Sequence, residues 1–404
     1  MGSNHGFRNV ALAGSCAVLA AALAGYPAAS SASPAGSRES SSETIPIGLM
    51  ADLSGTAGLF GPPTRDVGEL VVQQINAAGG VDGKQVKLIF MDSASDVTTT
   101  KSDAQRLVQQ DHVAALFGEF NSAQSEAALS VAAPANVPYF YAPVWQGGTC
   151  NADLFANGEV PQQQLREVIP WVQQKTGRKK WYLLGDDYVW PHASFALAKQ
   201  YITAAGGTVV GTSYVPLGTT DFSAEIAKIK SSGADIMIPA LVGSDAIAFE
   251  KQAFAAGMGN AQVQRLAILY EDNTRAAMGA KVTSGMFFST GYDRVIDNPT
   301  NKAFLAAYHA KFGKSAPVMQ TISEQPYVAI LSWAKAANAA HATDLAAISK
   351  ALSGMTIDAP AGTITWDANH YPTQPIYVDQ IQPDGRAKIV KSYAAVSNGQ
   401  TCKF

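Results

Sequence analysis

The chain has 404 residues, of which 47% are hydrophobic and 15% are charged, and its formal net charge is −3. One domain usually takes roughly 100–200 residues, so this length predicts two domains. The high apolar content argues against broad disorder, and the scattered Lys and Arg residues provide no basic stripe for a nucleic acid. Composition therefore favours a globular protein that binds no nucleic acid.

The first 32 residues have the organisation of a secretory signal peptide. A polar start carries Arg8, and an apolar run covers residues 10–25. That run is shorter than the roughly 20 residues of a membrane span, and small polar residues follow it. We expect residues 1–32 to be a signal peptide, residues 33–43 a disordered leader, and the mature protein to be periplasmic or otherwise extracytoplasmic. The alternative is a lipoprotein anchored through Cys16, although most of the apolar run follows that cysteine.

Apolar segments of strand length then alternate with helical patterns. Near-continuous apolar runs are typical of parallel strands that helices cover on both faces. The predicted strands cover residues 45–53, 86–93, 113–120, 138–144, 180–187, 207–217, 234–243, 265–272 and 284–292. Helices are expected between them, for example over residues 65–78 and 222–232, each of which is followed by glycine. Repeated βαβ units predict an α/β protein with doubly wound parallel sheets.

The pattern changes after residue 292. Helices are predicted over residues 299–312, 323–341 and 344–352, and a strand-and-turn region follows them. Two αβ series followed by helices and a hairpin predict two lobes joined by several crossings of the chain. We expect lobe 1 to comprise residues 44–160 and 293–355, and lobe 2 to comprise residues 161–292 and 356–404.

Motifs of several enzyme classes are missing from the sequence. There is no G-x-S-x-G nucleophile elbow, no G-x-x-x-x-G-K-[ST] phosphate loop and no C-x-x-C pair. The six histidines do not have the spacing of metal ligands. We therefore expect no catalytic residues, no metal site and no cofactor.

The residues that follow the predicted strands are the candidates for a binding site. Ligands of doubly wound sheets bind beyond the carboxyl ends of the strands. These positions carry hydroxyls, aromatic rings and carboxylates but few cations, which suits a small, partly apolar ligand. The candidates are Phe120, Asn121, Ser122, Tyr141, Pro143, Trp145, Tyr188, Trp190, Ser244, Glu271 and Asp272.

Asn121 and Ser122 lie where a predicted strand meets a predicted helix. Asn121 and Gln124 are three residues apart, as in a capping box, so we expect Asn121 to cap the helix. Ser122 is expected to hold the ligand, next to free N–H groups that suit a carboxylate or amide oxygen. Neither residue is needed as a nucleophile, because no elbow motif surrounds them.

An ammonium group on the ligand would need an acid. Glu271 or Asp272 could meet it, with cation–π help from Trp190 or Tyr188. The alternative for these acids is an ordinary role in a loop, and the sequence leaves both open.

Two cysteines, Cys150 and Cys402, would remain after removal of the signal peptide. An even pair in an oxidising compartment is a candidate disulfide, which would tie the C-terminal tail to a loop near the middle of the chain. The alternative is two unrelated thiols.

The opening of the expected mature chain resembles that of type I periplasmic solute-binding proteins. Residues 45–96 contain Asp-x-Ser-Gly after the first strand, I-N-A-A-G-G-V-x-G after the first helix and Asp-Ser-x-Ser-Asp after the second strand. The stretch GTITWDANHY resembles the late hairpin of that family, and the resemblance covers about residues 45–400. It implies the leucine/isoleucine/valine-binding group of ABC importers: two lobes with a multi-strand hinge, no enzymatic activity, and a small-molecule ligand. It also implies permease subunits as partners, and we expect a monomer.

Two stretches, TCNADLFANGEVPQQQ and LLGDDYVWPHAS, are closer to the branch of that family that binds urea and short amides. The residues that match the motifs of the branch are Phe120, Asn121, Ser122, Tyr141, Tyr188 and Trp190. Departures from the branch are His192-Ala193 in place of Arg-Glu, Pro143 in place of Thr, and Trp145-Gln146-Gly147 in place of Tyr-Glu-Gly.

These departures leave the ligand open. An amino acid, such as a branched-chain amino acid, and urea or a short amide are the leading alternatives, followed by a small aromatic acid. An alternative function for the same fold is a periplasmic ligand-sensing subunit of a signalling system.

Overall fold

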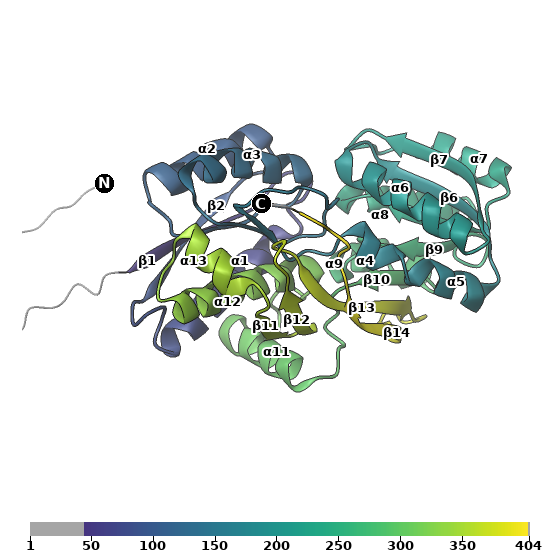
Figure 1. Cartoon of the computed structure of the whole chain (residues 1–404). Coiled ribbons are helices and arrows are strands. Elements are labelled where there is room, and N and C mark those ends of the chain that lie inside the picture. The colour runs from purple at the N-terminus through teal and green to yellow at the C-terminus, as the bar shows by residue number, and fades with distance from the viewer. Residues whose placement is uncertain (1–43, 403–404) are drawn as a thin grey trace, which may run out of the picture. The chain divides into compact units, whose positions relative to one another are not determined.

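A computed structural model describes residues 44–402 and arranges them around two sheets (Figure 1). The predicted signal peptide, the predicted leader and the alternative lipid site at Cys16 lie outside the described residues. In the described part of the chain, no helix has both the length and the hydrophobicity that crossing a membrane requires.

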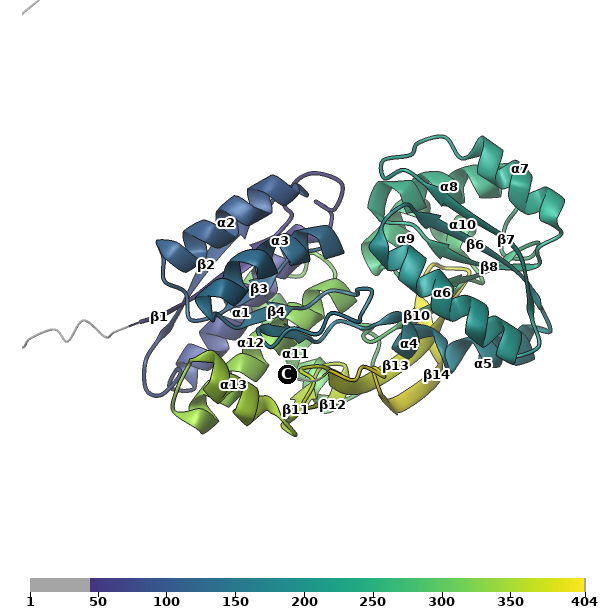
Figure 2. The same cartoon turned by 45° about the horizontal axis from the view of Figure 1, so that its top comes forward.

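The first sheet has the strand order β2-β1-β3-β4-β5, and its neighbouring strands are parallel. Its strands are β1 (Ile45–Ala51), β2 (Val86–Asp92), β3 (Leu116–Gly118), β4 (Tyr139–Tyr141) and β5 (Leu154–Ala156). Helices cover both faces (Figure 2). They are α1 (Gly61–Ala77), α12 (Thr321–Ala340) and α13 (Leu345–Leu352) on one face, and α2 (Val97–Gln109) and α3 (Ser122–Ala132) on the other.

The second sheet has the order β11-β12-β13-β10-β9-β8-β6-β7, with β14 beside β13. Its parallel part consists of β6 (Lys180–Asp186), β7 (Thr208–Val215), β8 (Ile236–Ala240), β9 (Gln264–Ala267) and β10 (Phe287–Thr290). Its antiparallel part consists of β11 (Thr356–Ala359), β12 (Gly362–Trp366), β13 (Pro372–Ile381) and β14 (Ala387–Val396). The predicted α/β class with parallel sheets in two lobes is confirmed.

The remaining helices surround the second sheet or extend the first lobe. They are α4 (Pro161–Leu165), α5 (Val168–Thr176), α6 (Val189–Ala204), α7 (Ser223–Ser232), α8 (Gly243–Ala255), α9 (Asp272–Met278), α10 (Ala280–Thr283) and α11 (Pro299–Phe312). Helix α11 has the predicted limits because the Asn298 side chain accepts a hydrogen bond from the Asn301 N–H and Pro299 occupies the first turn. Strand β5 was not predicted, since it is very short. Helices α4 and α5 lie between two predicted strands, where helices were expected without stated bounds, since they lack a long periodic pattern.

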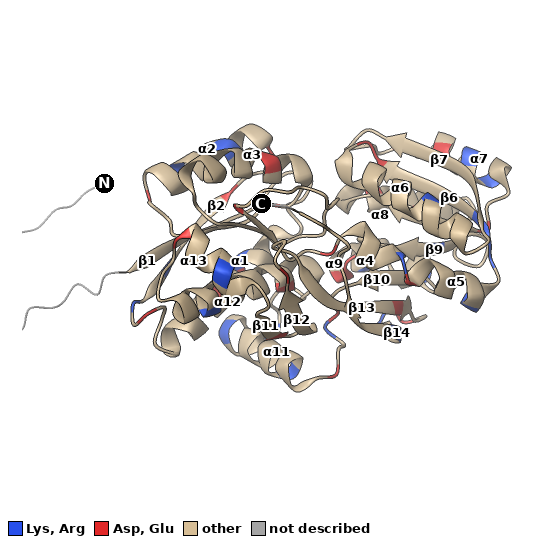
Figure 3. Ribbon diagram, in the orientation of Figure 1, with Lys and Arg blue, Asp and Glu red and all other residues tan. Residues whose placement is uncertain are grey.

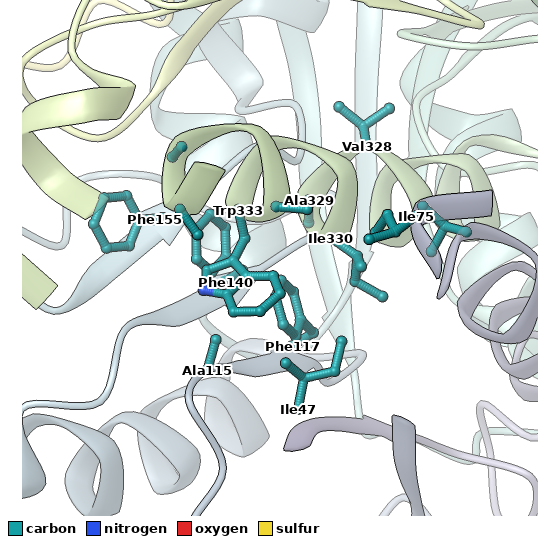
Figure 4. Packing of buried hydrophobic residues seen from close by; sticks show 14 of the residues in the cluster. Ile47, Ile75, Ala115, Phe117, Phe140, Phe155, Val328, Ala329, Ile330 and Trp333 are labelled. Atoms are coloured by element: carbon teal, nitrogen blue, oxygen red, sulfur yellow. The ribbon is translucent and has the colours of Figure 1, made fainter. Parts of the chain in front are cut away.

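The core of the first lobe is built on aromatic stacking between neighbouring strands (Figure 4). The ring of Phe140 stacks on Phe117 at 5.0 Å and on Phe155 at 4.8 Å, and Trp333 of α12 meets the edge of Phe117. Pairing of β3, β4 and β5 places these rings at the same level across the sheet. Apolar runs in these strands therefore serve packing against α12, as the near-continuous pattern indicated.

The hairpin of β11 and β12 connects the two lobes. Ile357, Ile364 and Trp366 belong to the same apolar cluster as Phe117 of the first sheet. Strand β12 nevertheless pairs with β13, so the hairpin is continuous with the second sheet. Residues 356–366, which we assigned to lobe 2, thus contribute to the core of the first sheet, and the lobe boundaries stay a prediction.

A disulfide joins Cys150 to Cys402 across 252 residues. Nearby, the Cys402 N–H donates to Asn369 Oδ1 at 2.8 Å, and the Tyr371 hydroxyl donates to the Thr149 carbonyl. The end of the described chain is therefore held against the loop that precedes β5, which is the arrangement expected for a paired Cys150 and Cys402.

Candidate ligand-binding site

Side chains from both lobes surround a narrow pocket beyond the strand ends, which we call the interlobe pocket. Its side chains lie so close together that the space between them does not admit a water molecule. It is lined by Phe120, Asn121, Ser122, Pro143, Val144, Tyr188, Trp190, Leu269 and Ile322. Six of the eleven predicted site residues are therefore brought together, from the ends of β3 and β4 on one side and the start of α6 on the other.

Asn121 caps helix α3. Its side-chain oxygen accepts a hydrogen bond from the Gln124 N–H at 3.0 Å, and its amide nitrogen donates to Gln124 Oε1 at 2.6 Å. Gln124 in turn donates to Asp52 Oδ1 at 2.9 Å, which ties the start of α3 to the end of β1. The predicted cap is confirmed, and Asn121 still borders the pocket.

Ser122 is the first residue of α3, and its side chain is buried. Its hydroxyl donates a short hydrogen bond to Gln146 Oε1. The first N–H groups of a helix have no intrahelical partner, and Asn121 takes only that of Gln124. The N–H groups of Ser122 and Ala123 therefore lie at the positive end of an 11-residue helix, beside the hydroxyl of Ser122.

Aromatic rings form the walls of the site. Phe120 stacks on Phe60 with centroids 4.9 Å apart and planes 9° from parallel. Tyr188 and Trp190 have centroids 6.2 Å apart on the opposite lobe. Phe60 was missed by sequence reasoning, although it follows β1 and the strand-end rule could have selected it. These rings favour a ligand with a flat or branched apolar body.

Tyr141 and Trp145 pack behind the interlobe pocket and do not line it. The Tyr141 hydroxyl donates to the Phe120 carbonyl at 3.1 Å. The Trp145 ring is buried and stacks on Tyr371 at 5.6 Å. Both residues hold the loops that carry Phe120 and Pro143.

The other predicted site residues of the second lobe, Ser244, Asp272 and Glu271, have different interaction partners. The Ser244 hydroxyl donates to Asp245 Oδ1 at 3.0 Å, at the start of α8. Asp272 is ion-paired with Arg275 at 2.9 Å and with Arg294 at 3.3 Å, so its charge is already compensated.

Glu271 is a better candidate than Asp272 for meeting an ammonium group. It is buried, and its Oε2 accepts a hydrogen bond from the Thr321 N–H at 3.1 Å. Its Oε1 has no hydrogen-bond partner among residues 44–402. Burial raises the pKa of Glu271 well above its ordinary value, although Arg275 opposes that shift. Glu271 itself does not line the interlobe pocket, but it is hydrogen-bonded to Thr321, which directly precedes Ile322 of the lining.

A second pocket adjoins the first on the side of lobe 1, and we call it the acid pocket. It is lined by Met50, Ala51, Asp52, Ala57, Phe60, Gly61, Thr64, Gly118, Glu119, Phe120, Pro143, Ile322 and Pro326. The two pockets share Phe120, Pro143 and Ile322. No Lys, Arg or His lines either pocket, and Figure 3 shows how sparse charged residues are along the ribbon.

Asp52 and Glu119 of the acid pocket were not among the predicted site residues. Both are buried, and the Ser93 hydroxyl donates to Glu119 Oε1 at 2.7 Å. Burial raises the pKa of Glu119 to about 8, so this carboxyl group is mostly protonated at pH 7. Glu119 has a φ of +71°, a backbone strain that is found preferentially at functional sites. Within residues 44–402, no group of three or more His, Cys, Asp and Glu side chains has the arrangement of a metal site.

Comparison with known proteins agrees with this architecture. The sequence profile of the family described as periplasmic binding protein matches residues 44–386. A Leu/Ile/Val-binding protein homolog of Brucella suis is 27% identical over 337 residues, which cover 79% of this chain and 83% of the relative.

Solved structures share the fold at lower identity. A solute-binding protein of an ABC transporter from Rhodopseudomonas palustris, in complex with 3,4-dihydroxybenzoic acid, superposes with a TM-score of 0.77 at 23% identity and covers 88% of this chain and 99% of its own. A branched-chain amino acid transporter substrate-binding protein from Streptococcus pneumoniae, in complex with isoleucine, has a TM-score of 0.75 at 24% identity, with the same coverage of both chains. The chain thus has the two-lobed type I fold of ABC transporter solute-binding proteins and belongs to the periplasmic binding protein family.

Proposed function

We propose that this protein is the extracytoplasmic solute-binding component of an ABC importer. In this proposal it captures a small carboxylate with an apolar or aromatic body between its lobes and delivers it to the permease. The observation that supports this proposal is the interlobe pocket, in which aromatic and aliphatic side chains of both lobes face the start of α3. Its role is binding without catalysis, and ligand-induced closure of the lobes would provide the signal to the permease.

The chemistry of the pocket supports a carboxylate at one end of the ligand. The N–H groups of Ser122 and Ala123 are donors, and the helix dipole favours a negative charge there. The Ser122 hydroxyl would also donate to the ligand if it exchanged Gln146 Oε1 for the carboxylate.

The apolar walls formed by Phe120, Trp190 and Leu269 favour a ligand with an apolar body over urea, which has none. An α-amino group, if present, would be met by Glu271, whose raised pKa the ammonium charge would lower on binding. Branched-chain amino acids and small aromatic acids both satisfy these conditions.

A binding panel tests this proposal. The mature protein would be studied by thermal shift and calorimetry with leucine, isoleucine, benzoate, 4-hydroxybenzoate, acetamide and urea. A ligand at a hundredfold excess over its Kd should raise the free energy of unfolding by about 2.7 kcal/mol. We expect at least one carboxylate to bind and to be taken up less by cells that lack this chain. Binding of acetamide or urea alone would contradict the proposed ligand class, and normal uptake without the chain would contradict the importer role.

Replacing Ser122 with Ala should weaken carboxylate binding by roughly five- to thirtyfold, because the hydroxyl that would turn from Gln146 to the ligand is lost. The melting temperature should change by only a few degrees. Ser130→Ala is the matched control, since Ser130 lies on the same helix, is exposed and donates only to the Ala127 carbonyl. Calorimetry on the unmodified protein, Ser122→Ala and Ser130→Ala measures the affinity of each for the carboxylate. An unchanged affinity for Ser122→Ala would show that Ser122 does not contact the ligand.

A further inference from the structure

The acid pocket has a feature that the folded chain alone does not use. Asp52 is buried, and its Oδ1 accepts hydrogen bonds from the Ser95 N–H at 2.8 Å and from Gln124 Nε2 at 2.9 Å. Its Oδ2 is buried as well but has no hydrogen-bond partner among residues 44–402. An unpaired buried carboxylate oxygen is costly, so such an atom beside a pocket points to a donor that arrives from outside the chain.

The neighbouring acid does not have this vacancy. Glu119 accepts a hydrogen bond from the Ser93 hydroxyl through Oε1, and the Thr100 hydroxyl lies 3.5 Å from Oε2. Hydrogen bonds from Gln124 and Ser95 fix the position of Asp52 from two elements, so its free oxygen is held rigidly. Asp52 is therefore the acceptor that the pocket offers.

Charge determines which chemical group this acceptor would take. No cationic side chain lines the pocket, so a second anionic group would be repelled by Asp52. A ligand hydroxyl or ammonium group would supply the missing donor. Burial raises the pKa of Asp52, and a cationic donor beside it would favour the ionised carboxylate. The pocket is narrow and is walled by Phe60 and Phe120, which suits a single small donor at the end of a flat apolar body.

We propose that the acid pocket binds an O–H or N–H donor at the distal end of the ligand, with Asp52 Oδ2 as its acceptor. This inference rests on the proposed function, in which the ligand carboxylate is held at the start of α3. The shared residues Phe120, Pro143 and Ile322 make the two pockets neighbours, so one ligand would reach both once these side chains move apart. The ligand class is an aromatic acid that carries a hydroxyl or ammonium group opposite its carboxylate.

A matched ligand series tests the donor directly on the unmodified mature protein. Calorimetry would compare benzoate, 4-hydroxybenzoate, 4-methoxybenzoate and 4-(aminomethyl)benzoate. We expect the hydroxyl or the ammonium compound to bind about ten- to hundredfold more tightly than benzoate and 4-methoxybenzoate. A hydrogen bond to a carboxylate contributes a free energy that corresponds to this change in affinity. The tighter of the two donor compounds then shows whether the preferred donor is neutral or cationic.

A substitution tests the acceptor. Asp52→Asn keeps an oxygen for Ser95 and Gln124 but puts an N–H group where Oδ2 lies, so the preference for 4-hydroxybenzoate over 4-methoxybenzoate should disappear. Asp92→Asn is the control, because Asp92 is an exposed acid that interacts electrostatically with Asp52 and does not line the pocket. If Asp52→Asn does not fold, the ligand series on the unmodified protein still decides whether the acid pocket binds a hydrogen-bond donor.

The outcomes separate this inference from the proposed function. Equal affinity for 4-hydroxybenzoate and 4-methoxybenzoate would overturn the donor site while leaving carboxylate binding intact. Binding of leucine without any benzoate would overturn the aromatic ligand class and leave the proposed function standing. Failure of every carboxylate in both panels would contradict the two together.

Discussion

The free energy of unfolding of the ligand-free protein should fall by roughly 3 kcal/mol or more between pH 5 and pH 8. The cause is a set of buried acids whose carboxyl groups lie in an apolar environment. Burial raises the pKa of Glu119, Asp186 and Glu324 to about 8, and that of Glu159 to about 7. In the unfolded chain these groups ionise near pH 4, so the folded state holds more protons throughout the window.

The sign of the effect follows from this proton difference. Stability declines with pH wherever the folded state binds more protons than the unfolded state. The contribution of these four acids is therefore complete below about pH 4 and is lost as pH rises through about 7 to 8. A protein whose buried acids are held ionised by cations would behave in the opposite way, with stability lost on acidification.

Urea unfolding at pH 5, 6, 7 and 8 measures the effect, and one substitution assigns it. Glu324→Gln should flatten the profile, since its amide oxygen can still accept the hydrogen bond that Glu324 Oε1 takes from the Ala361 N–H at 3.1 Å. Glu126→Gln should leave the slope unchanged, because Glu126 is exposed on α3. A stability that is constant or increases from pH 5 to pH 8 would show that these acids are ionised in the folded protein.

The buried acids also mark the limit of what the sequence could predict. Strands such as β1 and helices such as α11 follow from local patterns, namely apolar runs and a capping Asn before Pro299. Residues at the strand ends were expected to form the site, and Phe120, Ser122 and Tyr188 do meet in one pocket. Local sequence pattern and position after a strand were therefore sufficient to predict these elements and these three pocket residues.

The part of the site that the sequence did not predict depends on contacts between segments that are far apart in the chain. Asp52 was seen in the Asp-x-Ser-Gly motif, but its role depends on Ser95 and Gln124, which are 43 and 72 residues away. Trp145 follows a strand, as a site residue would, yet it packs against Tyr371, which is far along the chain. A single sequence states which residues follow a strand, but the side to which each of them points is set by such packing.

Replacing Arg275 with Met should destabilise the protein by about 3–5 kcal/mol, because it would leave buried acids without their cation. The Arg275 side chain is only 3% exposed and pairs with Asp272 at 2.9 Å and Asp293 at 3.5 Å. Its Nη1 donates to the Tyr270 carbonyl at 2.6 Å, and the guanidinium lies 5.0 Å from the ring centre of Phe288. The group thereby joins the start of α9 to the second sheet near β10.

Arg294→Met is the matched comparison, since Arg294 also pairs with Asp272, at 3.3 Å, but its side chain is 42% exposed. An ion pair at that exposure contributes at most about 1 kcal/mol, because water competes with it. Urea unfolding of both variants at pH 7 should therefore show a loss several times larger for Arg275→Met. At pH 5 the difference should shrink, because burial raises the pKa of Asp293 and Asp379 and protonation removes the uncompensated charge. Equal losses for the two variants, or a difference that does not change with pH, would mean that Arg275 acts through packing and not as the counter-charge of this acid cluster.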